Sequence, residues 1–256
     1  MNLDPELDAS PLGVAPEPED PRIRVQAVIL AAMAPEIAPF AERGSDHGEA
    51  FDVGNAIFQT VALAGADVVL VHTGIGLVNA ASATVAALHR YLPDWVISVG
   101  SAGGIRGKVQ VGDVAVSTKL VYSTADAVGF GYELGQVPGM PARFSADAHA
   151  ASLVKGMDGV VTGPFASGDV FTQGSWLEHV TTNFPEVVAV DMESTAIAQV
   201  CHSYGVGFVS IRGISDLCGT HAGEENAERA GDVSERAADI VEGLLTEAEG
   251  ASEQEA

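Results

Sequence analysis

Hydrophobic positions in this chain fall into two recurring patterns. Short apolar runs with little alternation occupy 23–32, 95–100 and 114–122, and they predict buried strands. Longer segments at 77–91, which has helical spacing and many alanines, and at 224–247 predict helices. Strands that alternate with helices are typical of a mostly parallel sheet covered on both faces. The pattern therefore predicts an α/β fold.

The rest of the chain continues this alternation. The other predicted elements are strands at 56–63, 66–73, 159–167, 187–190 and 207–214 and helices at 35–42, 174–182 and 192–204, with a glycine- and proline-rich loop at 129–141. Because the sequence shows no internal repeat and no linker, it predicts one domain over 23–248. The acidic segments 1–22 and 249–256 predict disordered ends.

Composition narrows the classes of function. The chain has 256 residues, 47% of them hydrophobic, which suits one large α/β domain with a substantial core. Its 35 acidic and 12 basic residues give a formal charge of -23, and such a surface repels nucleic acid and anionic membranes. A small neutral molecule remains a suitable substrate.

Cysteine usage and hydropathy bear on location and cofactors. Cys201 and Cys218 make no disulfide framework, and no Cys/His cluster suggests a metal site. The longest apolar run is too short to span a bilayer, and the N-terminus has no secretory signal. We therefore expect a cytoplasmic protein without a metal or cofactor, and without a nucleic-acid or membrane partner.

Two apolar runs that end in carboxylates point most directly to chemistry. Asp191 and Glu193 follow one run, and Asp216 follows another that passes through Arg212 and Ile214. Ligands gather at the carboxyl ends of strands in open α/β sheets, where two acids could share one substrate. One acid would donate a proton and the other would bind hydroxyl groups. The alternative is that Glu193 opens a helix and Asp216 caps the next one.

Glycine clusters also follow predicted strands. The turn at 72–76 leads into a helix, but the dinucleotide pattern GxGxxG fails at Asn79, and no phosphate-binding P-loop occurs. The small residues at 100–104 let a ligand approach the backbone closely. Phe171 follows a Gly-Asp pair and offers a flat face to a ring, although a core position is the alternative. Asp169 of that pair is expected to fix its own turn.

Taken in order, these segments resemble one family. They are Ala32-Met33-Ala34-Pro35-Glu36, Gly74-Ile75-Gly76, Gly100-Ser101-Ala102-Gly103-Gly104, Ala125-Asp126 with Phe130-Gly131-Tyr132-Glu133, Ser167-Gly168-Asp169-Val170-Phe171, Asp191-Met192-Glu193-Ser194-Thr195-Ala196 and Ile214-Ser215-Asp216. Together they resemble the purine nucleoside phosphorylase/uridine phosphorylase superfamily, and within it the 5'-methylthioadenosine/S-adenosylhomocysteine nucleosidases. The resemblance spans 25–245. It implies a three-layer α/β/α sandwich with a central twisted mixed sheet, and a homodimer.

The resemblance also implies roles for the acids. Asp216 would be the general acid that protonates adenine N7, and Ser215 would orient its carboxyl group. Such an acid needs a pKa raised by burial. Glu36 would activate water on the opposite face of the sugar, and Glu193 would accept hydrogen bonds from the ribose hydroxyls. Two carboxyl groups that flank the bond with room for water predict inversion.

Further residues are assigned to substrate binding by the same resemblance. Met192 is expected under the sugar, Phe171 and Thr172 at adenine, and Ser101, Ala102 and Gly103 near the water. Phe130, Tyr132 and Pro138 would close the 5' pocket across a dimer interface, and Met33 would supply apolar contact at the other end of the pocket. Family members often carry an aromatic residue where this chain has Asn226. The 5' preference therefore stays open between methylthio, homocysteine and 6-amino-6-deoxyfutalosine groups.

The attacking group is expected to be water. A phosphate site needs convergent cations, but the turns at 72–76 and 100–104 hold no Lys or Arg, and Arg106 beyond them is expected at the surface. The sequence therefore predicts hydrolysis of 5'-methylthioadenosine and S-adenosylhomocysteine, with 5'-deoxyadenosine and 6-amino-6-deoxyfutalosine as further candidates. The alternatives are a phosphate-dependent purine nucleoside phosphorylase and a nucleoside-binding protein without activity. Retention of all three acids argues against mere binding.

Overall fold

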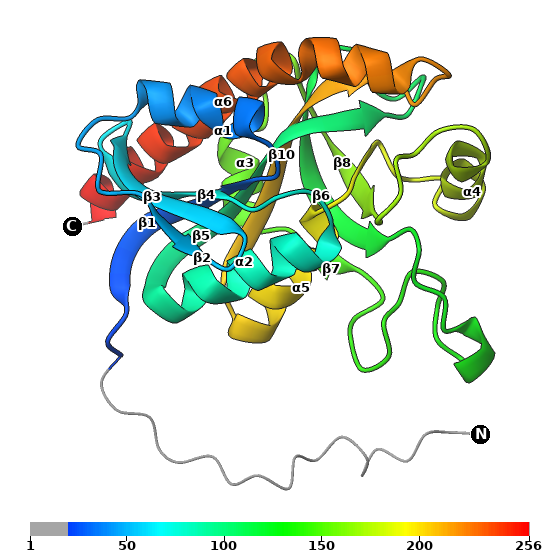
Figure 1. Ribbon diagram of the computed structural model, residues 1–256, viewed down its shortest axis with the longest axis horizontal. Helices are drawn as coiled ribbons and strands as arrows, with labels where there is room; N and C mark the ends of the chain where they lie inside the picture. The colour runs from blue at the N-terminus through cyan, green and yellow to red at the C-terminus, as the bar shows by residue number, and fades with distance from the viewer. Residues whose placement is uncertain (1–19, 256) are drawn as a thin grey trace, which may run out of the picture.

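The computed structural model describes residues 20–255, except for the side chains of 249–255. A central mixed sheet is covered by helices on both faces (Figure 1), which confirms the predicted three-layer α/β/α architecture. Within the described residues the strands are β1 (Ile23–Ala31), β2 (Phe51–Val53), β3 (Ala56–Leu63), β4 (Ala66–His72), β5 (Tyr91–Gly104), β6 (Val114–Tyr122), β7 (Phe144–Ser145), β8 (Val160–Ser167), β9 (Ala189–Asp191) and β10 (Gly207–Asp216). The helices are α1 (Ala34–Arg43), α2 (Leu77–Arg90), α3 (Ala148–Leu153), α4 (Ser175–Asn183), α5 (Ser194–Tyr204) and α6 (Ala222–Glu255), with a 3-10 turn η2 (Val128–Phe130).

The centre of the sheet is parallel. Strand β1 lies between β4 and β5, and β10 pairs with β5 on its other side, all in parallel register. Ile29 of β1 lies opposite Ile97 of β5, which in turn lies opposite Val209 of β10, and all three side chains are fully buried. Strands covered on both faces need apolar residues at successive positions, which explains the continuous runs in the sequence.

Strand β5 is longer than predicted, and the expected glycine turn at 100–104 is wrong. The strand continues through Gly104, and its last residues pair antiparallel with β9. Strand β10 pairs with β6, β6 with β8, and β8 with β9. Because β5 pairs with both β9 and β10, these five strands form a closed ring. Small residues permit the crowding, because a Cβ on Gly103 would lie 2.7 Å from Sγ of Cys218.

Each face of the sheet has its own helical layer. Helices α1, α3 and α6 cover one face, and α2 and α5 cover the other (Figure 1). Phe40 of α1 and Leu244 of α6 belong to the buried cluster on the first face. Ala87 of α2 and Ile197 of α5 belong to the cluster on the second. These layers leave the carboxyl ends of β1, β5 and β10 free to form a site.

Some predictions at the ends and in short elements need correction or lie outside the described residues. The backbone of helix α6 continues to Glu255, over most of the tail at 249–256, and the disorder expected there stays a prediction. Ala, Glu and Gln are good helix formers, and a helix extends readily from a packed segment. The predicted arm at 1–22 lies outside the described residues up to position 19. The elements β2, β7 and α3 are too short to give a periodic signal, and the sequence missed them.

In the part of the chain that the structure describes, no helix combines the length and apolarity needed to cross a membrane.

Candidate active site

A pocket opens at the carboxyl ends of the central strands. It encloses about 600 Å³ of space, a volume that includes the open solvent at its mouth. Predicted site residues that line it are Met33, Glu36, Ser101, Ala102, Gly103, Phe171, Thr172, Met192, Glu193 and Asp216. The other residues that line it are Ala32, Ile75, Val170, Val190, Asp191, Arg212, Cys218 and Asn226.

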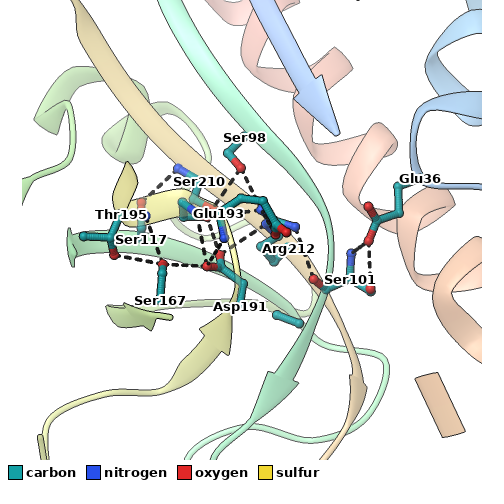
Figure 2. Close-up of polar contacts among 12 residues, drawn as sticks. Glu36, Ser98, Ser101, Ser117, Ser167, Asp191, Glu193, Thr195, Ser210 and Arg212 are labelled. Atoms are coloured by element: carbon teal, nitrogen blue, oxygen red, sulfur yellow. Dashed lines mark hydrogen bonds and ion pairs between the residues drawn. The ribbon is translucent and has the colours of Figure 1, made fainter. Parts of the chain in front are cut away.

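Glu36 is fixed in the first turn of α1 by three hydrogen bonds. Its Oε2 accepts from the backbone N–H of Met33 at 3.0 Å, and its Oε1 accepts from the N–H and Oγ of Ser101, each at 2.8 Å (Figure 2). The side chain is 1% exposed. Gly100 makes this possible, because a Cβ there would lie 2.6 Å from the Glu36 carboxyl. A buried carboxylate held this firmly can accept a further proton or hydrogen bond only from the pocket.

Glu193 enters the pocket just before α5. Its Oε1 accepts from the N–H of Gly76 at 2.9 Å, and its Oε2 lies 3.4 Å from Nη2 of Arg212. The turn before α2 therefore donates to a protein carboxylate. Burial raises the pKa of Glu193 to about 7; Asp191 and Glu36 also raise it, and Arg212 and the Gly76 N–H oppose the rise. The group can change charge near neutral pH.

Arg212 is the residue that the sequence reasoning missed. It is fully buried in β10, where Nη2 donates to Ser98 Oγ at 2.8 Å and Nη1 donates to the carbonyl of Ser101 at 3.3 Å. Its Nε lies 3.4 Å from Oδ2 of Asp191, an ion pair without hydrogen-bond geometry (Figure 2). The available signal was an arginine inside an otherwise buried strand, since arginine is rarely buried without a partner.

Asp191 holds the loop that carries Glu193. Its Oδ1 accepts from Ser167 Oγ at 2.6 Å and from the N–H groups of Glu193 and Ser194 at 3.2 and 3.1 Å. These contacts fit a structural role for this acid. Asp169, expected to fix its own turn, instead accepts from the N–H of Leu77 at 2.7 Å and so anchors the start of α2. That partner is distant in the sequence, so spacing gave no sign of it.

Asp216 is the last residue of β10. Its Oδ2 accepts from Ser215 Oγ at 2.8 Å, and its Oδ1 accepts from the N–H of Cys218 at 2.9 Å. Burial raises the pKa of Asp216, and Glu225 adds to the rise, whereas the two hydrogen bonds and Arg229 work against it. The net rise lets Asp216 hold a proton at higher pH than an ordinary aspartate. Ser215 contacts this carboxyl as expected, from behind the pocket lining.

The remaining predicted residues divide into two groups. Phe171 is 42% exposed at the pocket, so its alternative placement in the core is wrong. Phe130 is 73% exposed, and neither it nor Tyr132 or Pro138 lines the pocket of this chain. Their contact with a second subunit stays a prediction. Arg106 is exposed, as expected.

Comparison with known proteins assigns this arrangement to a family. The model of the phosphorylase superfamily matches residues 26–248. A 5'-methylthioadenosine/S-adenosylhomocysteine nucleosidase from a Geobacillus species is 39% identical over 230 residues, which cover 87% of this chain and 98% of the relative. This chain belongs to the nucleosidase family. The resemblance found in its motifs is thereby confirmed.

Solved nucleosidases share the fold. The enzyme from Colwellia psychrerythraea, solved in complex with adenine, is 35% identical with a TM-score of 0.83, and the match covers 86% of this chain and 94% of that one. The enzyme from Neisseria meningitidis, solved with methylthio-immucillin-A, is 34% identical with a TM-score of 0.82, and the match covers 87% of this chain and 99% of that one.

Among the described residues of this chain, no group of three or more His, Cys, Asp or Glu could hold a metal ion.

Proposed function

We propose that the protein hydrolyses the N-glycosidic bond of 5'-methylthioadenosine and S-adenosylhomocysteine, releasing adenine and the 5-substituted ribose. One observation carries the proposal. The buried carboxyl groups of Glu36, Glu193 and Asp216 line one pocket in a chain of the nucleosidase family. Relatives solved with adenine and with methylthio-immucillin-A support a purine nucleoside as the substrate.

Departure of adenine is assigned to Asp216. Adenine leaves readily only if it does so as a neutral base, so N7 must receive a proton or a strong hydrogen bond as the bond to the sugar breaks. The raised pKa of Asp216 supports this role, because it lets the acid keep a proton at higher pH than an ordinary aspartate. Phe171 would stack on the base, and the backbone of Thr172 would bind its edge.

The sugar and the attacking water are assigned to the other two acids. Glu36, held on three hydrogen bonds, would accept a proton from water as the water attacks the anomeric carbon. Glu193 would bind the ribose hydroxyls, and its charge would stabilise the oxocarbenium-like transition state. Met192 would pack under the sugar. Attack from the face opposite adenine inverts the configuration at that carbon.

Water is favoured over phosphate as the attacking group. A phosphate dianion needs free cationic groups, and Arg212 is the only Lys or Arg among the described residues that line the pocket. Its guanidinium already contacts Asp191 and Glu193. The charge of Arg212 is therefore offset before any substrate enters.

The assembly and location of the protein are also proposals. A homodimer, with the 5' pocket completed by the second subunit, is supported by exposed apolar side chains at the pocket, on α2 and in η2. They are Ile75, Val78, Val128 and Phe130, each at least half exposed. Met33 would supply an apolar contact within the pocket of the chain itself. A cytoplasmic location rests on the sequence argument alone.

The test is adenine release from 5'-methylthioadenosine, S-adenosylhomocysteine and inosine, each with and without inorganic phosphate. We expect release from the first two at rates that phosphate does not change, with free 5-substituted ribose as the second product. Formation of a ribose 1-phosphate would instead identify a phosphorylase. If every nucleoside stays intact with and without phosphate, the protein is not an enzyme of either class.

A further inference from the structure

Asn226 joins two strands at the pocket. It lies one turn into α6, which packs against both β5 and β10, and its side chain is partly buried in the pocket wall. Its Nδ2 donates to Ser101 Oγ of β5 at 3.0 Å and to Ser215 Oγ of β10 at 2.9 Å. These two serines are the hydroxyl partners of Glu36 and Asp216. One amide nitrogen therefore connects the groups assigned to opposite sides of the substrate.

The direction of these hydrogen bonds follows from the chemistry of the groups. Ser101 Oγ donates its single hydroxyl proton to Oε1 of Glu36, so the serine oxygen can only accept from Asn226. This requires the NH₂ group of the amide, not its carbonyl, to face the serines. The two hydrogens on Nδ2 provide one for each serine.

The same constraint acts at Ser215. Its hydroxyl has two acceptors in reach, Asp216 Oδ2 at 2.8 Å and the carbonyl of Ala102 at 3.3 Å. Asn226 donates to one of the two lone pairs of this oxygen, so the hydroxyl proton cannot point at the amide and turns to an acceptor, of which Asp216 is the nearer. The hydrogen bonds thus run outward from Asn226 in both directions.

We infer that Asn226 is a positioning residue that turns the hydroxyls of Ser101 and Ser215 toward the carboxyl groups of Glu36 and Asp216. The inference rests on the proposed function for its catalytic consequence, but the hydrogen-bond directions stand without it. Asn226 acts through the serines and moves no proton to or from the substrate. Without it, the Ser215 hydroxyl proton is free to turn toward the position that the amide occupied, and Asp216 then loses a donor.

The charges around Asp216 decide which variants are informative. Glu225 and Arg229 face it from α6 and form an ion pair at 3.6 Å, Cys218 lies beside it, and Glu36 lies across the pocket. Asn226→Leu removes both donors without changing any of these charges. Asn226→Asp keeps the shape but replaces the donor by a carboxylate that accepts from both serines. Glu228→Gln, at an exposed position on the same helix, is the control for a charge change.

The deciding measurement is the titration of the Asp216 carboxyl, followed by carbon NMR in the wild-type protein and each variant. It needs no turnover, so it stands apart from the test of the proposed function. We expect Asn226→Leu to raise the pKa of Asp216 by about 1, as Ser215→Ala also does, because the donor that favours the ionised form is lost. Asn226→Asp raises it further, and Glu228→Gln leaves it unchanged. An Asp216 titration that is the same in wild type and Asn226→Leu overturns the inference.

Kinetics add a second readout. We expect Asn226→Leu to lower kcat on the order of tenfold with little change in KM, since it misorients groups rather than removing a substrate contact. In a Ser101→Ala/Ser215→Ala background the same substitution should have no further effect on kcat. Additive losses would show that Asn226 acts independently of the serines, and a change confined to KM would make it a simple pocket-wall residue.

Discussion

The guanidinium of Arg212 and the carboxylate of Glu193 face each other at 3.4 Å, both buried in the wall of the pocket. Arg212 also lies 3.4 Å from Asp191, so one cation serves two carboxylates. The burial of Glu193 alone would favour its neutral form, and Arg212 counters this. Arg212 therefore helps to set the charge of the Glu193 carboxyl group, which is the group proposed to bind the ribose hydroxyls.

Removal of the arginine should be costly. Arg212→Met leaves two buried carboxylates without their cation, and breaking a buried pair from one side destabilises a protein by about 3–5 kcal/mol. We expect this loss in the free energy of unfolding measured with urea at pH 8. The loss should shrink at lower pH, where protonation neutralises Glu193, whose pKa is raised. Arg106→Met, at an exposed position, is the control and should change stability by less than about 0.5 kcal/mol. Equal losses would contradict the pairing.

Glu193 should give a measurable pH dependence. Its folded-state pKa of about 7 lies above its ordinary value of 4.5, so its proton stabilises the fold fully below about 4.5, and this contribution is lost as the pH rises through about 7. In the same range the carboxylate needed for catalysis forms, so kcat/KM should rise with pH through about 7. Glu193→Gln should lose activity on the order of 100-fold and also lose this acidic limb. A limb that persists in the variant would assign it to another group.

Much of the fold could be predicted because strands that are buried on both faces of the sheet appear in the sequence as continuous hydrophobic runs. The predicted strand at 114–122 matches β6 residue for residue, and 23–32 differs from β1 by one residue. The error at 100–104 has a physical cause, since glycines usually end strands. Here Gly100 and Gly104 instead let Glu36 and Val109 approach the strand. Whether a glycine ends a strand or lets a neighbouring side chain approach it depends on contacts in three dimensions, which the sequence does not show.

The candidate site was predicted in part for a similar reason. The sequence alone shows that Glu193 and Asp216 follow hydrophobic runs. In the structure both residues line the pocket together with Glu36. The partners of Arg212 come from β5, from the last residue of β9 and from the segment after it, so no local spacing indicates them. The hydrogen bonds of Asn226 likewise depend on how α6 lies against two strands. The catalytic roles themselves stay predictions.

A methyl group at position 100 should displace Glu36. Gly100→Ala places a Cβ 2.6 Å from the Glu36 carboxyl, at a φ of +132° that is strained for any L side chain. Because a displacement of about 1 Å can cost on the order of 100-fold, we expect kcat to fall by about that factor. Gly107→Ala is the matched control, with a φ of +86° but no neighbouring atom within 4 Å. Both variants should lose stability through backbone strain, and only Gly100→Ala should lose activity; a similar loss in Gly107→Ala would refute the steric argument.

Asp216→Asn should separate chemistry from binding. The amide has nearly the shape of the carboxyl group but no proton acidic enough to transfer to N7, so turnover should fall by about 100- to 10,000-fold. Affinity for 5'-methylthioadenosine should stay within about tenfold, or roughly 1.4 kcal/mol, because the other contacts in the pocket remain. Adenine release measures the first quantity, and calorimetry on the slow variant measures the second. The variant should also lose the alkaline limb of the pH profile, since that limb reports the loss of the Asp216 proton. Normal cleavage by Asp216→Asn would exclude Asp216 as the general acid, and loss of binding with it would assign the residue to substrate affinity instead.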